Sequence, residues 1–203
     1  SFYIETVINV FTILSSISFV MYLYLIQGNF KSIRNNIELR VFLMIILGFS
    51  LFISFNLIWT GTYDSIGTAF RHAFFQVTSI ATTSGYTIGD PSVWPSFSKA
   101  LLFTLFFIGG CSASTSGSIK VIRIVVLFKL IARGFVKRLH PQAICSVKMG
   151  EKNIPSPMVS SVAAFICLYG TTYLVSALVL SLQNLDFETT LSATAALLSN
   201  TGC

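Results

Sequence analysis

The chain has little charge. Of its 203 residues only 10% are Asp, Glu, Lys or Arg, whereas 54% are hydrophobic, and the mean hydropathy is +0.79. Soluble globular domains usually carry about 25% charged residues. The composition therefore excludes an ordinary soluble domain and indicates a protein that lies in a lipid bilayer.

Groups for metal binding and acid-base chemistry are also scarce. The four cysteines form no CxxC pair and adjoin no histidine cluster, so the sequence indicates neither a zinc site nor a disulfide framework. We expect His72 to be interfacial and His140 to lie in a basic loop. The acidic residues all fall in predicted loops or at span ends: Glu5, Glu38, Asp64, Asp90, Glu151, Asp186 and Glu188. Proton relays, intramembrane metal sites and carboxylate catalysis therefore lack the groups they need.

Four apolar stretches reach the length of about 20 residues that a helix needs to cross the hydrocarbon layer. They lie near residues 6–26, 39–59, 97–132 and 157–182. The third is interrupted at residues 109–117 by nine small or polar residues that include three glycines. A helix does not pass undisturbed through such a run. The sequence therefore predicts three regular spans and one broken span in an all-α polytopic membrane protein.

Two further apolar segments, residues 66–81 and 187–198, are too short to cross the bilayer and too apolar for solvated loops. The first is followed by the run TTSGYT and the second by SNTG. Non-helical backbone at membrane depth is tolerated only where protein buries it or where it lines a watery cavity. We therefore expect two re-entrant helices beside a pathway.

Loop charges predict the orientation. Thirteen Lys and Arg against seven Asp and Glu give a net charge of +6, and they are too dispersed for a nucleic-acid surface. The basic residues cluster after the first and third spans: Lys31, Arg34, Arg40, Lys129, Arg133, Lys137, Arg138, Lys148 and Lys152. Those two loops are predicted to be cytoplasmic, and both re-entrant helices to enter from outside.

The chain also contains a candidate internal repeat. Gly85 and Gly202 are 117 positions apart, and the same offset places Phe70 on Phe187 and Leu39 beside the start of the fourth span. The repeated unit is helix, external pore helix, glycine-containing strand, helix. Polytopic proteins resemble one another in general, but matched order, spacing and orientation favour duplication.

The two glycine-containing strands are candidates for an ion filter. Glycine permits backbone conformations that turn successive carbonyl oxygens toward one axis, where they can replace the water around a dehydrated monovalent cation. The partial negative charge at the C-terminus of each pore helix would favour a cation there. A plain turn is the alternative for a single such run, but two of them follow re-entrant helices. The candidate filter residues are Thr82, Thr83, Ser84, Gly85, Tyr86, Ser199, Asn200, Thr201 and Gly202.

The interrupted third span is a candidate gate. Membrane helices use Gly and Ser for close packing, but this run exceeds what packing needs, and small residues provide a hinge. For Lys120 and Arg123, which follow it, snorkelling to the interface is a simpler explanation than a direct gating role. The candidate gate residues are Gly109, Gly110, Cys111, Ser112, Ala113, Ser114, Thr115, Ser116 and Gly117.

With these motifs the sequence resembles the TrkH-type members of the Trk/Ktr/HKT superfamily of potassium transporters. The resemblance lies in IGGCSASTSGSIKVIRIVVLFK, residues 108–129, and in ATTSGYT, residues 81–87. It implies four helix, pore-helix, helix repeats around one central pore, with Gly85 and Gly202 as filter glycines and residues 109–117 as the gating loop. K⁺ would then be the transported ion, bound by backbone carbonyls without any cofactor.

The resemblance also implies how the chain is divided. Residues 1–27 would be the closing helix of a preceding repeat, 28–38 a cytoplasmic loop, 39–132 a complete repeat, 133–155 a basic cytoplasmic loop, and 156–203 an incomplete repeat. The chain would thus be part of a larger protein and would not conduct alone. Further implications are a multi-pass location in the cell inner membrane among lipids, a homodimer, and a cytoplasmic nucleotide-binding regulatory subunit.

Two transport alternatives remain open at this point, and we do not expect an enzyme. A Na⁺-selective or Na⁺/H⁺-coupled cation transporter would have the same architecture. A broken-helix secondary transporter would place its breaks in inverted repeats, whereas this repeat is parallel. A membrane-embedded enzyme would need a base or a metal, and the predicted spans offer only Ser, Thr and Cys.

The orientation gives a first prediction. In the full-length protein without native cysteines, a cysteine at Arg138 should be protected from an impermeant thiol reagent in intact cells, and one at Glu188 should react. Residues 31–40 and 133–152 are expected inside, and 62–94 and 184–188 outside, because positive loops stay cytoplasmic. Labelling of position 138 from outside would contradict both the orientation and the parallel repeat.

Overall fold

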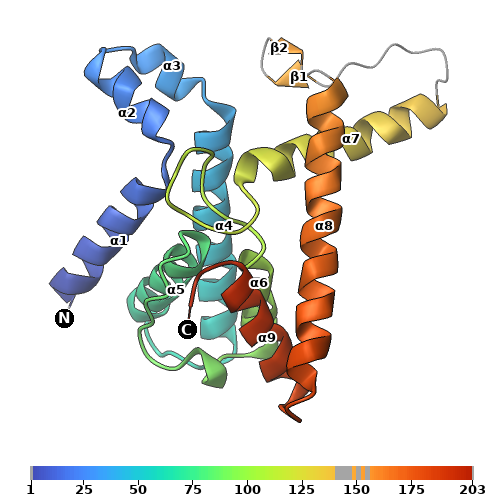
Figure 1. The fold of residues 1–203 in the computed structure, drawn as a ribbon. Coiled ribbons are helices and arrows are strands. Elements are labelled where there is room, and N and C mark those ends of the chain that lie inside the picture. The colour runs from blue at the N-terminus through green and yellow to red at the C-terminus, as the bar shows by residue number, and fades with distance from the viewer. Residues whose placement is uncertain (1, 140–147, 150–151, 154–155, 203) are drawn as a thin grey trace.

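The computed structural model describes residues 2–139, 148–149, 152–153 and 156–202, and the structure over these residues is almost entirely helical (Figure 1). Its helices are α1 (Phe2–Ser16), α2 (Phe19–Ile26), α3 (Phe30–Arg34), α4 (Ile37–Trp59), α5 (Ile66–Ala81), η1 (Pro91–Val93, a 3₁₀ turn), α6 (Ser96–Leu105), α7 (Val121–Leu139), α8 (Ser156–Ser181) and α9 (Phe187–Leu198). Two short strands, β1 (Lys148–Met149) and β2 (Lys152–Asn153), pair antiparallel. The predicted position of His140 lies outside the described residues.

The second and fourth predicted spans are confirmed as continuous helices. α4 has 23 residues, and the apolar part of α8 has 25, with mean hydropathies of 2.5 and 1.9. The side chain of Asn36 caps α4 by accepting a hydrogen bond from the Leu39 N–H at 2.9 Å. Gly61, at φ +68°, follows the last turn of α4, where a left-handed residue ends a helix at little cost.

Both re-entrant segments are confirmed as helices with the predicted bounds. α5 and α9 have 16 and 12 residues, too short to cross a bilayer. Asp186 is the N-cap residue of α9, and its carboxylate accepts a hydrogen bond from the Glu188 N–H at 3.1 Å.

The prediction of one regular first span is wrong. α1 and α2 are separate helices whose axes differ by 92°. The break follows Ser15 and Ser16 and contains Ser18, and the backbone groups that it frees are bound by another part of the chain, as described below. Three serines within four residues in the middle of an apolar stretch were the sequence signal for this break.

The third span is broken as predicted, and the break is longer than expected. It extends from Phe106 to Lys120, between α6 and α7. The segment doubles back on itself, since the Gly109 N–H donates to the Ile119 carbonyl at 2.8 Å and the Val121 N–H donates to the Gly110 carbonyl at 3.2 Å. A Cβ at Gly109 would lie 2.2 Å from the Gly117 carbonyl oxygen, so only glycine permits this close return.

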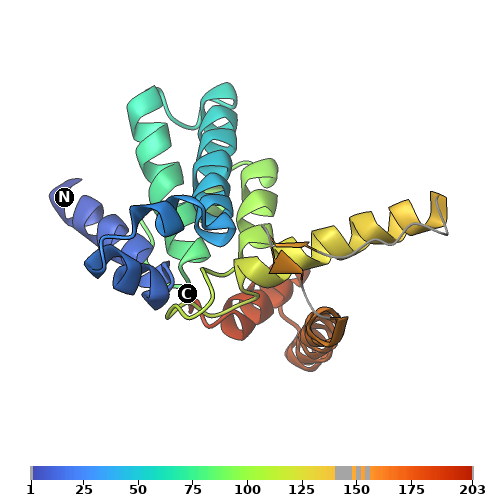
Figure 2. The same ribbon diagram turned by 90° about the horizontal axis from the view of Figure 1, so that it is seen from above.

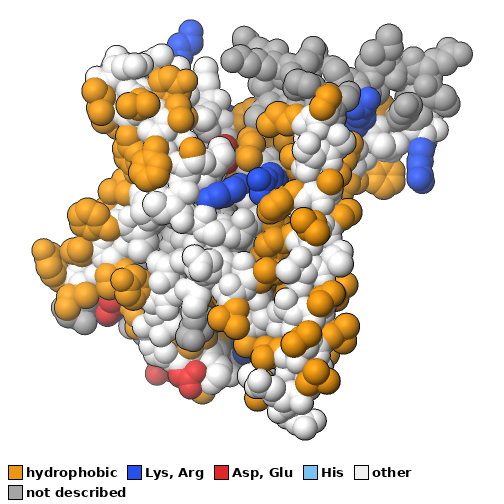
Figure 3. Space-filling model, in the orientation of Figure 1, with side chains coloured by type: hydrophobic (Ala, Val, Ile, Leu, Met, Phe, Trp, Pro, Cys, Tyr) orange, Lys and Arg blue, Asp and Glu red, His pale blue; other side chains and the backbone are white. Residues whose placement is uncertain are grey.

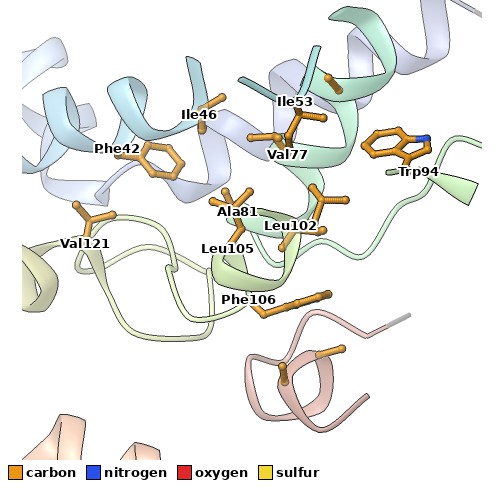
Figure 4. Packing of buried hydrophobic residues seen from close by; sticks show 14 of the residues in the cluster. Phe42, Ile46, Ile53, Val77, Ala81, Trp94, Leu102, Leu105, Phe106 and Val121 are labelled. Carbon is orange, nitrogen blue, oxygen red and sulfur yellow. The ribbon is translucent and has the colours of Figure 1, made fainter. Parts of the chain in front are cut away.

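The core lies where α4, α5 and α6 pack together (Figure 4). α5 packs closely against α4, and the small side chains Ala69 and Ala73 of α5 are fully buried, as suits close helix packing. The fully buried side chains of the core include Phe42, Ile46, Ile53 and Leu57 from α4, Ala69, Ala73 and Val77 from α5, Leu105 from α6 and Val121 from α7. This core supports α5 on one side of the interrupted segment.

α7 and α8 lie farther from this core. α7 projects from the body in both orthogonal views, and α8 packs on α9 and on the start of α7 (Figures 1 and 2). α8 exposes the apolar side chains Leu168, Leu174, Val175, Leu178 and Val179, and Figure 3 shows hydrophobic patches along this helix. Such a surface suits lipid tails or further helices of a membrane protein.

Candidate ion pathway

The two pore helices end in the same hydrogen-bond pattern. After α5 the N–H groups of Thr82, Thr83 and Ser84 donate to the carbonyls of Thr78, Ile80 and Ser79 at 2.9, 3.0 and 2.9 Å. After α9 the N–H groups of Ser199, Asn200 and Thr201 donate to the carbonyls of Ala195, Leu197 and Ala196 at 2.9, 3.1 and 3.0 Å. Every donor and acceptor in the second set lies 117 positions after its counterpart in the first. The offset inferred from two glycines therefore recurs in the backbone geometry.

Backbone dihedral angles repeat in the same way. Thr83 and Asn200 have φ of 57° and 59°, and Gly85 and Gly202 have φ of 74° and 65°. A left-handed conformation is uncommon for Thr and Asn and costs free energy unless the surroundings impose it. Alternate left-handed residues remove the up-and-down alternation of carbonyls that an ordinary β-strand has.

Within each of the two segments, side-chain hydroxyl groups hydrogen-bond to one another. The Thr82 hydroxyl bonds to the Ser84 hydroxyl at 3.3 Å, and the Ser199 and Thr201 hydroxyls are 2.7 Å apart, again at matching positions. Thr82, Ser199 and Thr201 are buried. The predicted residue Tyr86 differs from these, because 53% of its surface is exposed.

The two segments meet at Gly85. A Cβ on Gly85 would lie 2.3 Å from the Thr201 carbonyl oxygen and 2.9 Å from that of Gly202. Both distances are far below van der Waals contact, so only glycine fits between the segments. The structure thus brings together the glycine-centred segments that follow α5 and α9, with the C-terminal ends of both helices at the meeting point.

The interrupted segment lies against both of these segments. The Gly117 N–H donates to the Thr83 hydroxyl at 2.8 Å. A Cβ on Gly117 would lie 2.1 Å from the Ser199 carbonyl oxygen. Residues 109–117, hereafter the glycine loop, therefore contact the segment after α5 through a hydrogen bond and the segment after α9 through backbone packing.

The break between α1 and α2 holds the far side of the glycine loop. The Cys111 N–H donates to the Ser16 carbonyl at 2.9 Å, and the Phe19 N–H donates to the Ala113 carbonyl at 3.0 Å. The hydroxyls of Ser116 and Ser16 bond at 2.7 Å. These bonds satisfy polar groups that a broken helix leaves free at membrane depth, and they explain why the first span is not straight.

The expectation that Lys120 snorkels to the interface is wrong. Its ammonium group turns back and donates to the carbonyl and the hydroxyl of Ser114, both at 3.2 Å, and to the Ser116 carbonyl. Arg123 lies with its guanidinium 3.7 Å from the centre of the Phe165 ring on α8. Both basic residues line a hollow of about 460 Å³ between the glycine loop, α7 and α8, and basic side chains are visible in that region in Figure 3.

Glu38 has a role that the sequence did not indicate. It lies in the first turn of α4, as a span-end residue should, but only 6% of its surface is exposed. Its two carboxylate oxygens accept hydrogen bonds from the Ser112 N–H at 2.5 Å and from the Ser112 hydroxyl at 2.7 Å. Glu38 therefore lies at a span end, as predicted, but the sequence made no prediction of its burial. Only the long-range contact reveals it, because nothing in the local sequence of α4 marks it.

The face of the re-entrant helices that was predicted to be external carries ion pairs and helix caps. Lys99 pairs with Glu188 at 2.9 Å, which links α6 to α9, and Arg71 pairs with Glu5, which links α5 to α1. Hydrogen bonds from Ser92 lower the pKa of Asp90, which caps η1. His72 stacks on Tyr63 with ring centres 5.0 Å apart.

Among the described residues no group of His, Cys, Asp and Glu side chains is arranged to hold a metal ion. The oxygens near Gly85 are the backbone carbonyl oxygens of Thr201 and Gly202.

Comparison with known proteins identifies the family. The family model of TrkH, described as a cation transport protein, matches residues 1–203. The chain belongs to the TrkH family. Over 200 residues it is 34% identical to the Trk system potassium uptake protein TrkH of Salmonella typhimurium, covering 98% of this chain and 41% of that protein. It is 34% identical to Trk system potassium uptake protein TrkG of Escherichia coli, covering all of this chain and 42% of that protein.

A solved structure shows the same fold. The potassium transporter TrkH from Vibrio parahaemolyticus superposes with a TM-score of 0.92 at 34% identity, covering 100% of this chain and 44% of that one. The all-α membrane fold expected from the sequence is therefore confirmed. The chain spans less than half the length of the relatives that it matches.

The packing of the glycine loop gives a second prediction. In the full-length protein, Gly117→Ala should lower stability by about 1–3 kcal/mol, because its Cβ has no room beside the Ser199 carbonyl. Gly134→Ala is the matched control, since position 134 is helical, exposed and has no atom within 4 Å of a built Cβ. Thermal unfolding in detergent measures both changes. Equal effects of the two substitutions would show that the loop does not rest on the segment after α9.

Proposed function

We propose that the chain is part of a potassium uptake pathway through the cell inner membrane, in which residues 82–86 and 199–202 contribute backbone carbonyls to a selectivity filter. The observation that carries the proposal is the repeated backbone geometry of two segments that meet at Gly85. K⁺ uptake is also what the names of the relatives state for those proteins.

The chemistry of the segments supports a monovalent cation. Carbonyl oxygens arranged in a ring around such an ion can replace its hydration shell without a charged side chain in the site. The C-terminal ends of α5 and α9 each contribute a partial negative charge of about half an elementary unit at the same place. Thr82 and Ser199 are the C-cap residues of these helices and begin the two filter segments. Two more segments, from the part of the protein outside this chain, would complete the ring.

We propose that the glycine loop gates this pathway. Its contact with both filter segments through Gly117 supports a position in the path of an ion that leaves the filter toward the cytoplasm. Apart from Cys111, which is buried in the apolar core, the loop is held mainly by hydrogen bonds, so it can be displaced with less disturbance than a packed helix. The names of the relatives refer to a Trk system, which supports further protein partners. A homodimer and a cytoplasmic nucleotide-binding regulatory subunit, which the resemblance to TrkH-type transporters implies, belong to this proposal.

The filter proposal is tested by Gly85→Ser in the full-length protein. A side chain at this position pushes against the Thr201 carbonyl, so K⁺ over Na⁺ discrimination should fall about tenfold or more, while the amount of folded protein falls less. The measurement is Rb⁺ uptake in competition with Na⁺ in cells that lack other K⁺ uptake.

The control for this variant is Gly89→Ser. Gly89 also has a positive φ, +71°, but it lies outside the proposed filter. It reproduces the backbone strain without touching the Thr201 carbonyl. Folded Gly85→Ser protein with unchanged ion preference would make Gly85 a turn residue and overturn the filter.

The gate proposal is tested by shortening the glycine loop within residues 111–116. If the loop obstructs the pathway, basal flux per folded molecule should rise several-fold and regulatory control should weaken, with ion preference unchanged. A packing role predicts less folded protein and no rise in flux. A well-expressed deletion that conducts no faster than its parent would exclude the gate.

A further inference from the structure

The glycine loop has one charged attachment to a separate, rigid element. Lys120 lies three residues after the loop and binds its carbonyls from within the same interrupted segment. Glu38 instead belongs to α4 and is 74 residues away from its partner Ser112 in sequence. The neighbouring α4 side chains Phe42 and Ile46 are fixed in the core, with 1% and 2% exposure. The Glu38 carboxylate is therefore held in place by a packed helix, and the glycine loop is hydrogen-bonded to it through Ser112.

The geometry of this attachment makes it strong and specific. Both carboxylate oxygens are used, one by the Ser112 N–H and one by the Ser112 hydroxyl. Hydrogen bonds to an ionised acceptor are roughly twice as strong as those between neutral groups. A buried carboxylate that loses its donors is costly, so Ser112 can leave only when water or a cation replaces it.

We propose that Glu38 is a positioning residue that latches the glycine loop in the position seen here, and that release of Ser112 accompanies opening of the pathway. This inference rests on the proposed gating function of the loop. In the released state the Glu38 carboxylate faces the space that the loop vacates, where its negative charge favours a hydrated cation.

Cys111 provides a readout of the latch that does not depend on transport. It precedes Ser112 in the loop, and only 1% of its surface is exposed, so its thiol is protected while the loop is held. Displacement of Ser112 exposes it. The rate at which a small membrane-permeant thiol reagent modifies Cys111 therefore reports the fraction of time for which the loop is released.

The experiment uses the full-length protein in which Cys111 is the single remaining cysteine. Glu38→Ala should raise the Cys111 modification rate and the flux per folded molecule, each about tenfold, which corresponds to about 1.4 kcal/mol of lost attachment. Glu38→Gln should raise both less, because its amide oxygen still accepts from the Ser112 N–H. Glu188→Gln is the matched control, since it neutralises an acid whose side chain is 67% exposed, and it should change neither.

The outcomes separate the latch from the gate. Unchanged modification of Cys111 in both Glu38 variants overturns the latch, whatever happens to flux. Faster modification with unchanged flux supports the latch and refutes the gating function on which it rests. If Glu38→Ala does not fold, Glu38→Gln decides alone. In a double-mutant cycle, Ser112→Ala combined with Glu38→Ala should give less than the sum of the single effects, and additivity would contradict a direct contact.

Discussion

Backbone amides and carbonyls that leave a helix inside a bilayer must find partners within the protein, and this constraint organises the whole chain around the glycine loop. Because the loop interrupts the third span, its backbone N–H and C=O groups lack the partners that a continuous helix would provide. The break between α1 and α2 supplies partners for Cys111 and Ala113, and in turn has its own Ser16 carbonyl satisfied. Two interrupted helices thus satisfy each other, and the bend of 92° in the first span is a consequence of the break in the third.

Much of the fold follows from local pattern. Apolar length and terminal polar residues predicted α4, α8 and both pore helices closely, because span length and re-entrant length differ clearly in a bilayer of fixed thickness. The glycine content of residues 109–117 predicted a break for the same local reason. The sequence also placed the glycine-centred segments after the two pore helices, where the structure has them side by side.

What the sequence could not supply were contacts between distant segments. The serines before α2 were a local signal for a break in the first span, but the loop that binds them is about 100 residues away in sequence. Lys120 was assigned to the interface because the sequence pattern does not show that its ammonium group can bind the backbone carbonyls of the loop. Glu38 was placed correctly at a span end, but its burial could not be predicted, because its partner Ser112 is 74 residues away in sequence. Position on an element is a local property, whereas the partner of a charge is not.

The centre of the candidate pathway contains very little side-chain packing. The missing Cβ of Gly85 leaves room for the carbonyls of residues 201 and 202, and the missing Cβ of Gly117 leaves room for the Ser199 carbonyl. Backbone therefore packs directly on backbone among three segments from two repeats. Such packing fixes carbonyl positions more tightly than long side chains would, since it leaves no rotamers to adjust. It also ties the loop to the segments beside it, because movement of Gly117 removes both a hydrogen bond to Thr83 and the surface on which Ser199 rests.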